Sequence, residues 1–486
     1  MSTDTTDGKL HPHPQPPGED ALVRAAGRLQ LTFDEEHGGF GRGPKLPQPQ
    51  LLDFLVRAGA RGFGRARAMS EWTLRAMALG GIYDQVGGGF HRHATDRAWR
   101  VPDFEKTLAV NALLARAYTH AWQAWHTPLH RRVAEETLDY IVGDLSTGTG
   151  ALASGEAGEP EGPEGPEGPG SRFYVWSHEE LSAVAPEAVA FFGVKEGVEA
   201  NVLTALGEDR PDQAWRKLRE ARATRVRPRR DDTVLASWNG LAIGALAEGG
   251  ATFGRPDLID AARRAAGAAA ANVLDGGDLM HCAGVPGLLE DYAYLSEGLF
   301  TLWEATFDRQ FLDQAAGLAE RMIAAFWDEQ EGAFCSTSPG RSDLPAPSVP
   351  IADGETPSPN AVAAWVLQRL AALTDREDHR ARAVRILRVA GPYLEANPEA
   401  TASFFAAVDL HALGPKKVVI VGEPGDPAVA ALAGEAWTRL VPNRVLSGGA
   451  PGSGAPLTEG RHLLGGRPAA SVCEEETCLP PTTDPA

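Results

Sequence analysis

The residues best suited to chemistry gather in one glycine-rich stretch, GGIYDQVGGGFHRHATDRAWRVPDFEK at positions 80–106. An imidazole titrates near neutral pH and can remove a proton beside a carbonyl, so His91, assisted by Asp84, suits a sugar isomerase. Two carboxylates such as Glu105 and Asp291 suit instead the acid and base of an inverting glycoside hydrolase. The stretch therefore holds the candidates for an isomerase and one of the two carboxylates that a hydrolase would need.

Each of these residues also has a structural interpretation. Pro102 predicts a helix start, and Glu105 and Lys106 would then be a charge pair in its first turn, where the helix dipole stabilises a carboxylate. A lone histidine is more often structural than catalytic, and this holds for His91 and more so for His93. Glycine at this density indicates tight turns, so the stretch is either a hairpin or part of a site.

A second set of residues has the chemistry of sugar binding. Aromatic rings stack on the apolar C–H faces of sugars, and amides and carboxylates pair with hydroxyl groups. The candidates are Trp99, Lys106, Trp176, Asp231, Asp232, Trp238, Asn239 and Tyr292. The two aspartates precede a predicted helix, where acidic residues are commonly caps, so none of these residues is diagnostic alone.

Helices must position these side chains, because apolar residues recur with a helical period through about the first 410 residues. In SPNAVAAWVLQRLAAL, Ser358 suits an N-cap and Pro359 the first helical position, and Trp365 lies on the apolar stripe that follows. The predicted helices span residues 102–126, 129–145, 234–250, 257–273, 288–307, 309–327 and 358–373.

A short pattern recurs between the helices, with polar residues, then glycines, then an apolar or aromatic residue. It appears as EEHGGFG, QVGGGFH, STGTGAL, LDGGDLM and EQEGAFC, beginning at residues 35, 85, 146, 274 and 329. The spacing suits a repeated unit of two helices and a glycine-turn hairpin. Such units stack into an open solenoid or close into a ring.

The composition excludes several classes of partner and site. Forty-six basic and sixty-five acidic residues give a net charge of −19, which disfavours nucleic acid and anionic membranes. No signal sequence or long apolar segment is found, since Glu248 interrupts LASWNGLAIGALAEGGATF, and this indicates a cytoplasmic protein. The four cysteines, Cys473 and Cys478 among them, fit neither a disulfide framework nor a metal finger. We expect no cofactor and no metal.

Ordered blocks along the chain resemble the spermatogenesis-associated, thioredoxin-domain-containing protein family. The blocks are FDEEHGGFGRGPKLPQP, the stretch at 80–106, NALLARAY, FYVWSHEEL, RDDTVLASWNGL, LLEDYAYL, DGETPSPNAVAAW and SVCEEETCLPPTTDP. The resemblance implies an (α/α)6 toroid of the six-hairpin glycosidase type, similar to N-acylglucosamine 2-epimerases. It also implies a sugar-like ligand at the mouth of the ring. Members usually carry an N-terminal thioredoxin-like domain, which we expect to be absent, so a separate thioredoxin-like protein is an expected partner.

Several positions depart from the family pattern. Asp103 stands where a histidine is usual, Val110 where an aspartate is usual, and Thr233 where a lysine is usual. An acidic segment usually following STGTGAL is replaced by a proline- and glycine-rich run. Three functions therefore stay open: an aldose–ketose isomerase or epimerase, an inverting glycoside hydrolase, and a non-catalytic pseudoenzyme or binding module.

The expected organisation is a mainly α chain of three parts. Residues 1–20 form a disordered tail, and residues 21–411 form the toroid, with short hairpins at one mouth and a low-complexity insertion at 155–171. From residue 412 the strand-like KKVVIV, a helix, NRVLSGG and AASVC predict a small C-terminal α/β appendage. No glycine fingerprint of a nucleotide domain follows its first strand.

Overall fold

The computed structural model describes residues 12–158, 169–198, 200–272, 274–275, 278–338, 348–474 and 477–485. The expected disordered tail therefore lies mostly outside the described residues, and so does most of the expected insertion at 155–171. The central part of the LDGGDLM pattern also lies outside them.

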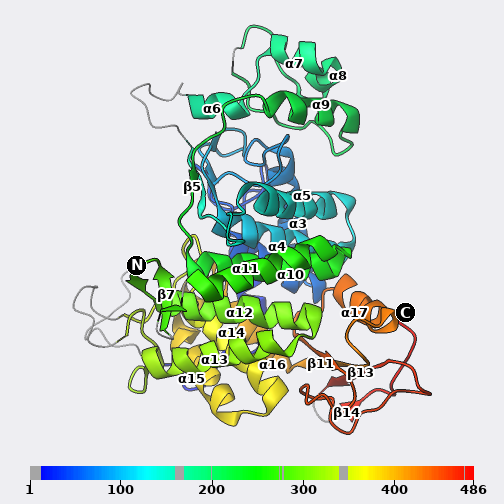
Figure 1. Cartoon of the computed structure of the whole chain (residues 1–486). Coiled ribbons are helices and arrows are strands. Elements are labelled where there is room, and N and C mark those ends of the chain that lie inside the picture. The colour runs from blue at the N-terminus through cyan, green and yellow to red at the C-terminus, as the bar shows by residue number, and fades with distance from the viewer. Residues whose placement is uncertain are drawn as a thin grey trace, which may run out of the picture.

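Six helices form the inner ring of a toroid. Each packs against the next along the chain, and the last contacts the first, so the ring closes (Figure 1). Their faces carry the apolar residues of the main core, which joins all six. They are α2 (Pro49–Ala60), α4 (Leu108–Trp125), α10 (Ala236–Phe253), α12 (Leu289–Thr306), α14 (Pro359–Thr374) and α16 (Phe404–Leu413).

Six further helices pack around the ring and alternate with the inner ones along the chain. They are α1 (Glu19–Leu29), α3 (Gly64–Leu79), α5 (Pro128–Asp144), α11 (Pro256–Asn272), α13 (Arg309–Phe326) and α15 (Glu377–Ala396), followed by the 3-10 turn η1 (Pro398–Thr401). The predicted (α/α)6 toroid is confirmed, and so are most predicted helices to within three residues. Ser358 caps α14 by accepting from the Ala361 N–H, with Pro359 at the first helical position.

The helix predicted from Pro102 begins later than expected. Pro102–Asp103 is the short strand β2, and α4 begins at Leu108, where the Thr107 side chain accepts from the Val110 N–H. Glu105 and Lys106 thus lie in extended backbone at the mouth and not in the first turn of a helix. Thr107 caps the helix directly before a run of helix formers. Pro102 is equally compatible with extended backbone, so it does not by itself determine where a helix starts.

The recurring glycine pattern forms tight hairpins between an outer and an inner helix, as predicted. In the second hairpin Tyr83 pairs with Phe90, and in the first Phe33 pairs with Phe40. Gly89 has a φ of 75°, and a Cβ placed there would lie 2.6 Å from the Tyr140 ring, so only glycine fits. Related short strands at this mouth are β1 (His93–Ala94), β3 (Lys106–Thr107), β4 (Gly155–Glu156), β5 (Arg230–Asp231), β6 (Leu274–Asp275), β7 (Asp278–Cys282), β8 (Val285–Pro286), β9 (Trp327–Asp328) and β10 (Ala333–Phe334).

Three buried asparagines attach these hairpins to the inner helices. The side-chain amide of Asn111 accepts from the Phe90 N–H at 2.6 Å and donates to the Phe90 carbonyl at 3.0 Å. Asn239 holds Leu152 in the same way, and Asn360 holds Phe334. The three stand near the start of α4, α10 and α14, so the repeated unit includes this pair of asparagine hydrogen bonds as well as the hairpin.

A small helical unit that the sequence analysis did not anticipate lies beside α3 and α5, at the top of Figure 1. It comprises α6 (Pro169–Tyr174), α7 (His178–Val184), α8 (Pro186–Phe192) and α9 (Asp212–Arg222), between strands β4 and β5. It has its own core around Trp176, Leu181 and Leu218, and Val86 of the second hairpin joins that core. The unit is thereby fixed to the toroid.

The C-terminal segment forms the predicted α/β element against the opposite end of the ring (Figure 1). Its four-stranded sheet has the order β12-β11-β13-β14, with β11 (Lys416–Val421) parallel to β12 (Arg444–Gly449) and antiparallel to β13 (Ala469–Glu474). The edge strand is β14 (Thr477–Cys478), and α17 (Pro427–Thr438) packs on the sheet. Across the described residues, no helix combines the length and the hydropathy that a membrane span requires.

Candidate functional site

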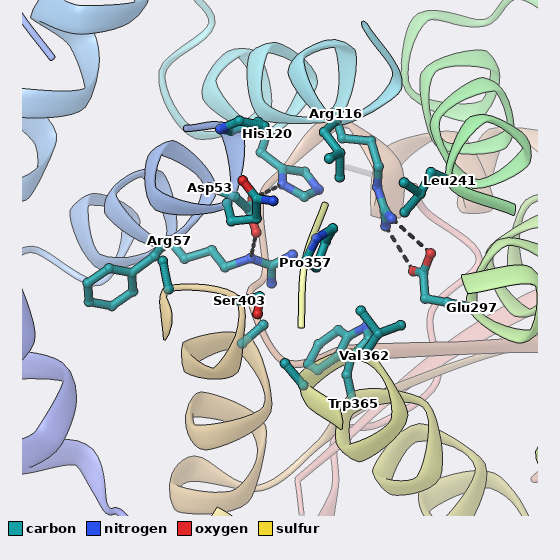
Figure 2. Close-up of a pocket in the computed structure, with 17 residues that line it drawn as sticks. Asp53, Arg57, Arg116, His120, Leu241, Glu297, Pro357, Val362, Trp365 and Ser403 are labelled. Atoms are coloured by element: carbon teal, nitrogen blue, oxygen red, sulfur yellow. Dashed lines mark hydrogen bonds and ion pairs between the residues drawn. The ribbon is translucent and has the colours of Figure 1, made fainter. Parts of the chain in front are cut away.

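The inner helices enclose a cavity of about 100 Å³ on the ring axis. Its apolar lining includes Leu113, Leu241 and Val362. In Figure 2, Val362 lies beside Trp365, and Leu241 lies beside Arg116 and Glu297. The charged and polar lining consists of Gln50, Asp53, Arg57, Arg116, His120, Glu297 and Ser403. All six inner helices or their N-terminal flanks contribute to this lining.

Helical spacing explains why these charges face one another. Asp53 and Arg57 are four residues apart on α2, and Arg116 and His120 are four apart on α4. Residues at this spacing share one helix face, and here that face points into the ring.

His120 lies at the centre of the charged cluster. Its Nδ1 forms a short hydrogen bond with Asp53, and its Nε2 lies 2.7 Å from a Glu248 oxygen. Ionised carboxylates only accept hydrogen bonds, so a ring between two of them is held with both nitrogens protonated. Burial alone lowers the pKa of His120, but Glu248 and Asp53 outweigh it and raise the pKa above its usual value.

Arg116, on the same helix as His120, bonds carboxylates on two further inner helices, α10 and α12. Its Nη atoms donate to both oxygens of Glu297 at 2.9 and 3.0 Å, and its Nε donates to Glu248 at 2.9 Å. Burial raises the pKa of the Glu248 carboxyl, but the charges of His120 and Arg116 lower it by more, so the pKa lies below its usual value. The result is a buried network in which every carboxylate has a cationic partner.

The network continues toward the C-terminal element through a second space of about 40 Å³. There Arg369 donates to Glu304 at 2.7 Å, and the second Glu304 oxygen accepts from the Leu446 N–H at 2.9 Å. Arg57 donates to the Pro442 carbonyl at 2.9 Å. The C-terminal segment therefore closes the base of the cavity with main-chain groups.

None of the twelve residues singled out from the sequence lines this central cavity. Asp84, His91 and Lys106 do come together, but beneath the hairpins at the mouth. Lys106 donates to Asp84 at 2.8 Å, and Arg222 of α9 donates to the other Asp84 oxygen at 2.6 Å. Burial raises the pKa of Asp84, but Arg222 and Lys106 hold it well below its usual value. The structure therefore brings these three candidates together at the mouth and not on the ring axis.

The first hairpin repeats the arrangement around Asp84. There Lys45 donates to Asp34 at 2.7 Å, and Arg97 donates to both Asp34 oxygens at 2.7 and 2.8 Å. In each copy the aspartate also accepts from N–H groups of its own turn, and the lysine also donates to a glycine carbonyl. A carboxylate, lysine and arginine that recur in two hairpins are explained by the hairpin itself. A catalytic role for Asp84 and a sugar-binding role for Lys106 stay predictions.

His91 is buried beside this cluster. Its Nδ1 lies 3.0 Å from the Phe104 carbonyl, and Phe104 and Tyr174 pack edge-on against the ring. Burial, followed by the charge of Lys106, lowers the pKa of His91 to about 3. The ring is therefore neutral at physiological pH and does not titrate in the range that the sequence argument assumed.

We expect the His91→Gln variant to lose less stability in acid than the parent. Unfolding lets His91 bind a proton below pH 6.5, and the folded protein binds it only near pH 3. Stability from this group is therefore present at high pH and lost as the pH falls, by roughly 2.7 kcal/mol between pH 8 and pH 4.5. Urea unfolding of both proteins at the two pH values measures the difference. His93→Gln, whose side chain is 31% exposed, is the control and should behave like the parent.

The remaining candidates at the helix starts have structural partners. Asp291 is fully buried and accepts from the Ser237 and Leu288 N–H groups at 3.0 and 2.8 Å, so it links α10 to the start of α12. Asn239 is one of the three asparagines that hold the hairpins. Tyr292 is buried and accepts from the Leu279 N–H at 3.3 Å.

The other candidates divide between the core and the surface. Trp99 is buried and donates to the His37 carbonyl at 3.0 Å, and Trp176 is a core residue of the helical unit. Trp238 is partly buried against the main core. Glu105 pairs with Arg92 at 2.8 Å on the rim, and Asp231 and Asp232 are exposed and bonded to Thr233 and Arg230.

His281, Glu290 and Asp291 are close enough to hold a metal ion, with one ligand atom from each within 4.8 Å of the others. The sequence analysis expects no metal. Both Asp291 oxygens already accept from backbone N–H groups, and each also lies 3.1 Å from His281 Nδ1. The oxygens thus have little capacity left for a cation.

A signal for the central network was present in the sequence. Glu248 interrupts an otherwise apolar segment, and Arg116 and His120 stand in the helix that contains NALLARAY. Charged residues on the apolar side of several helices indicate a polar interior, because a charge is buried only when it is paired.

Comparison with known proteins places these observations in context. No protein family model matches the chain. Human spermatogenesis-associated protein 20 is 31% identical over 531 residues, which cover 94% of this chain and 67% of the human protein. Its mouse counterpart is 29% identical with the same coverage, and an uncharacterized protein of Caenorhabditis elegans is 26% identical over 84% of this chain and 64% of its own length.

Two solved structures share the fold. A D-mannose isomerase superposes with a TM-score of 0.52 at 10% identity, covering 77% of this chain and 85% of its own. The cellobiose 2-epimerase of Bacillus thermoamylovorans gives 0.50 at 11% identity, covering 76% and 85%. Identity this low shows the fold alone.

Proposed function

We propose that this chain, which belongs to the family of spermatogenesis-associated protein 20, binds a sugar in its central cavity and acts as an aldose–ketose isomerase or epimerase. The observation that carries the proposal is His120, which faces the cavity between two carboxylates and beside two arginines. The sugar specificity of the two structural neighbours agrees with this proposal.

The chemistry requires one group that moves a proton and others that stabilise charge. An isomerase removes the proton beside a carbonyl, and negative charge then develops on oxygen. In the proposed mechanism the bound sugar takes the place of Glu248 at His120 Nε2. The ring, neutral once that nitrogen has lost its proton, removes and returns the proton beside the carbonyl, while Asp53 holds the ring through Nδ1. Arg57 and Arg116 present guanidinium groups to the cavity, where they stabilise the developing oxyanion.

The size of the cavity determines how a sugar would lie. Its volume of about 100 Å³ is below the roughly 300–1,000 Å³ of pockets that enclose a whole ligand. We therefore place the reacting carbonyl end beside His120 and the rest of the sugar toward the mouth. Trp365, on the cavity wall, offers the aromatic face against which sugar C–H groups pack.

An inverting hydrolase receives less support from the cavity. Such an enzyme needs a carboxylic acid that keeps its proton near neutral pH. Burial raises the pKa of Asp53 and of Glu297, but the cations beside them outweigh it and leave both values below the usual range. Neither carboxyl is protonated at neutral pH. A non-catalytic sugar-binding module and a separate thioredoxin-like partner stay predictions.

Deuterium exchange tests the proposal directly. The protein is incubated in deuterated water with a panel of aldoses and ketoses, and separately with oligosaccharides, and the carbon beside the carbonyl and the reducing ends are followed by NMR. Exchange at that carbon supports an isomerase or epimerase, and new reducing ends from oligosaccharides would identify a hydrolase. Chemical-shift changes without either reaction would identify a binding module and refute the proposed catalysis.

A further inference from the structure

We propose that the Cys473–Cys478 disulfide is a thiol–disulfide exchange site that accepts electrons from a dithiol reductant, with Arg461 stabilising the thiolate that leaves. The site is independent of the central cavity and of the proposed sugar chemistry. The sequence analysis assigned no pairing to these cysteines, and the structure joins them.

The disulfide lies at the edge of the C-terminal sheet. Cys473 on β13 and Cys478 on β14 are opposite each other in the antiparallel register. Cys473 is 4% exposed, whereas Cys478 is exposed to solvent. An incoming thiolate can therefore reach one sulfur far more easily than the other.

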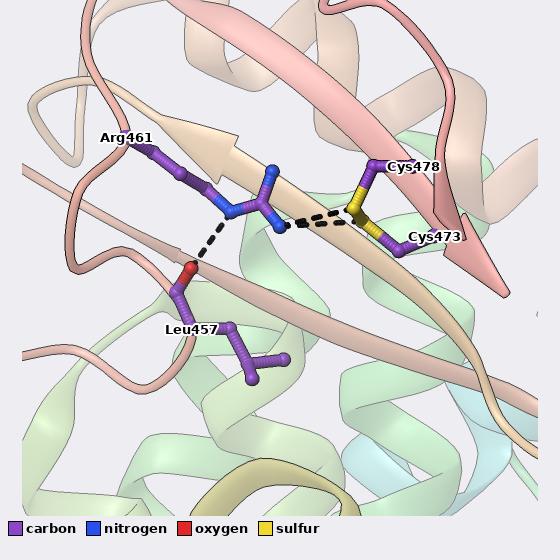
Figure 3. Close-up of a disulfide and its surroundings, with 4 residues drawn as sticks. All are labelled: Leu457, Arg461, Cys473 and Cys478. Carbon is purple, nitrogen blue, oxygen red and sulfur yellow. Dashed lines mark hydrogen bonds between the residues drawn. A yellow bond between two sulfur atoms is a disulfide. The ribbon is translucent and has the colours of Figure 1, made fainter. Parts of the chain in front are cut away.

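A guanidinium group faces the two sulfurs, as Figure 3 shows. Arg461 Nη2 lies 3.2 Å from the Cys473 sulfur and 3.4 Å from the Cys478 sulfur. The Arg461 Nε donates to the Leu457 carbonyl at 2.9 Å, which fixes the direction of the side chain. A neutral disulfide gains little from a cation, but a thiolate at the same place gains much.

The proposed step follows from exposure and charge. A thiolate of the dithiol attacks the Cys478 sulfur and forms a mixed disulfide, while the Cys473–Cys478 bond breaks and its electron pair goes to Cys473. Arg461 stabilises the Cys473 thiolate, which lowers its pKa and makes it a better leaving group. The second thiol of the reductant then attacks the mixed disulfide. It releases Cys478 and leaves the reductant oxidised and both cysteines reduced.

A purely stabilising role explains the disulfide less well. Its cysteines are five residues apart in the sequence, and closing so short a loop removes little entropy from the unfolded chain. A cross-link placed for stability alone also needs neither an exposed sulfur nor an aligned guanidinium.

The test compares rates of reduction by dithiothreitol in the folded, full-length protein. Peptide mapping after alkylation assigns the thiols and separates them from Cys282 and Cys335, the two free cysteines. We expect Arg461→Gln to slow reduction of the disulfide by roughly 3- to 10-fold. Arg461→Lys, which keeps the charge, should retain most of the rate, and circular dichroism confirms that each variant is folded.

Arg467→Gln is the matched control. It removes the same charge from an exposed position in the same segment, and its rate should equal that of the parent. Three results would overturn the proposal: equal slowing in both glutamine variants, an unchanged rate in Arg461→Gln, or a disulfide that resists reduction until the protein unfolds.

Discussion

The His120→Gln variant is expected to exchange the sugar proton roughly 10²- to 10⁴-fold more slowly than the parent, because it loses the group proposed to move that proton. Glutamine keeps a polar side chain of similar reach, so the cavity should stay folded. His91→Gln is the matched control, since His91 is equally buried but lies beneath the mouth hairpins. It should exchange at the parental rate.

The pH dependence of the parent gives a second readout. A base acts when neutral, and the carboxylates raise the pKa of His120, so the exchange rate should rise with pH through a value above 6.5. A rate that falls over this range would indicate an acid instead. Loss of exchange in His91→Gln with normal exchange in His120→Gln would place the catalytic site in the mouth cluster around Asp84 and not in the central cavity.

Arg116→Met should lower the free energy of unfolding by roughly 3–5 kcal/mol, the cost of leaving buried charges without a partner. Arg116 makes three hydrogen bonds to Glu248 and Glu297, whose side chains are 6% and 4% exposed. Methionine fills a similar volume, so the loss reports the charge. Urea unfolding monitored by tryptophan fluorescence measures it.

Arg255→Met is the control for this prediction. Arg255 also bonds two carboxylates, Asp139 and Asp257, but those side chains are 50% and 59% exposed. Exposed pairs contribute little, so the variant should lose no more than about 1 kcal/mol. The double variant Arg116→Met/Glu297→Met removes one orphaned charge and should recover part of the loss. Equal effects of Arg116→Met and Arg255→Met would show that the central network is hydrated.

The periodicity of the sequence was sufficient to predict the helices, whereas the closed ring was predicted from the family resemblance, because the repeat alone also allowed an open solenoid. The glycine pattern and the helical stripes both describe local structure. The glycine pattern reappears in the hairpins at Phe40 and Phe90, and the stripes reappear as the apolar faces of the helices. The helical unit beside α3 and α5 was missed because its helices are short. Three of the four have only six or seven residues, too few for a period to be recognised.

The site was harder to predict for a physical reason. Whether Arg116 or Asp53 faces water or the ring axis depends on five other helices, and a charged residue on one helix looks the same in either case. Trp365 shows the same difficulty. Its place on the apolar stripe predicted a core residue whose truncation would cost roughly 3–5 kcal/mol. The structure places it on the cavity wall between Arg57 and Arg369, only partly buried.

The sequence analysis placed its catalytic candidates in the mouth cluster because a tight turn with unsatisfied backbone groups uses the same residue types as a catalytic site. Asp84 binds the N–H groups of Val86 and Gly87, and Lys106 binds the Gly88 carbonyl, so each satisfies backbone groups that a tight turn leaves free. The same arrangement at Asp34 and Lys45 in the first hairpin favours the structural explanation over the catalytic one.

The closure at the base of the ring has a consequence for the order in which the protein is made. Arg57 donates to the Pro442 carbonyl, and Glu304 accepts from the Leu446 N–H, so both charges stay hydrated until residues 442–446 have been synthesised. Nascent chains ending before residue 440 would hold an incomplete ring with water on its axis. Contacts between residues so far apart in sequence form late and slowly. Closure of the base should therefore wait for this segment, and chains that stop short of it expose an open, charged base to proteases.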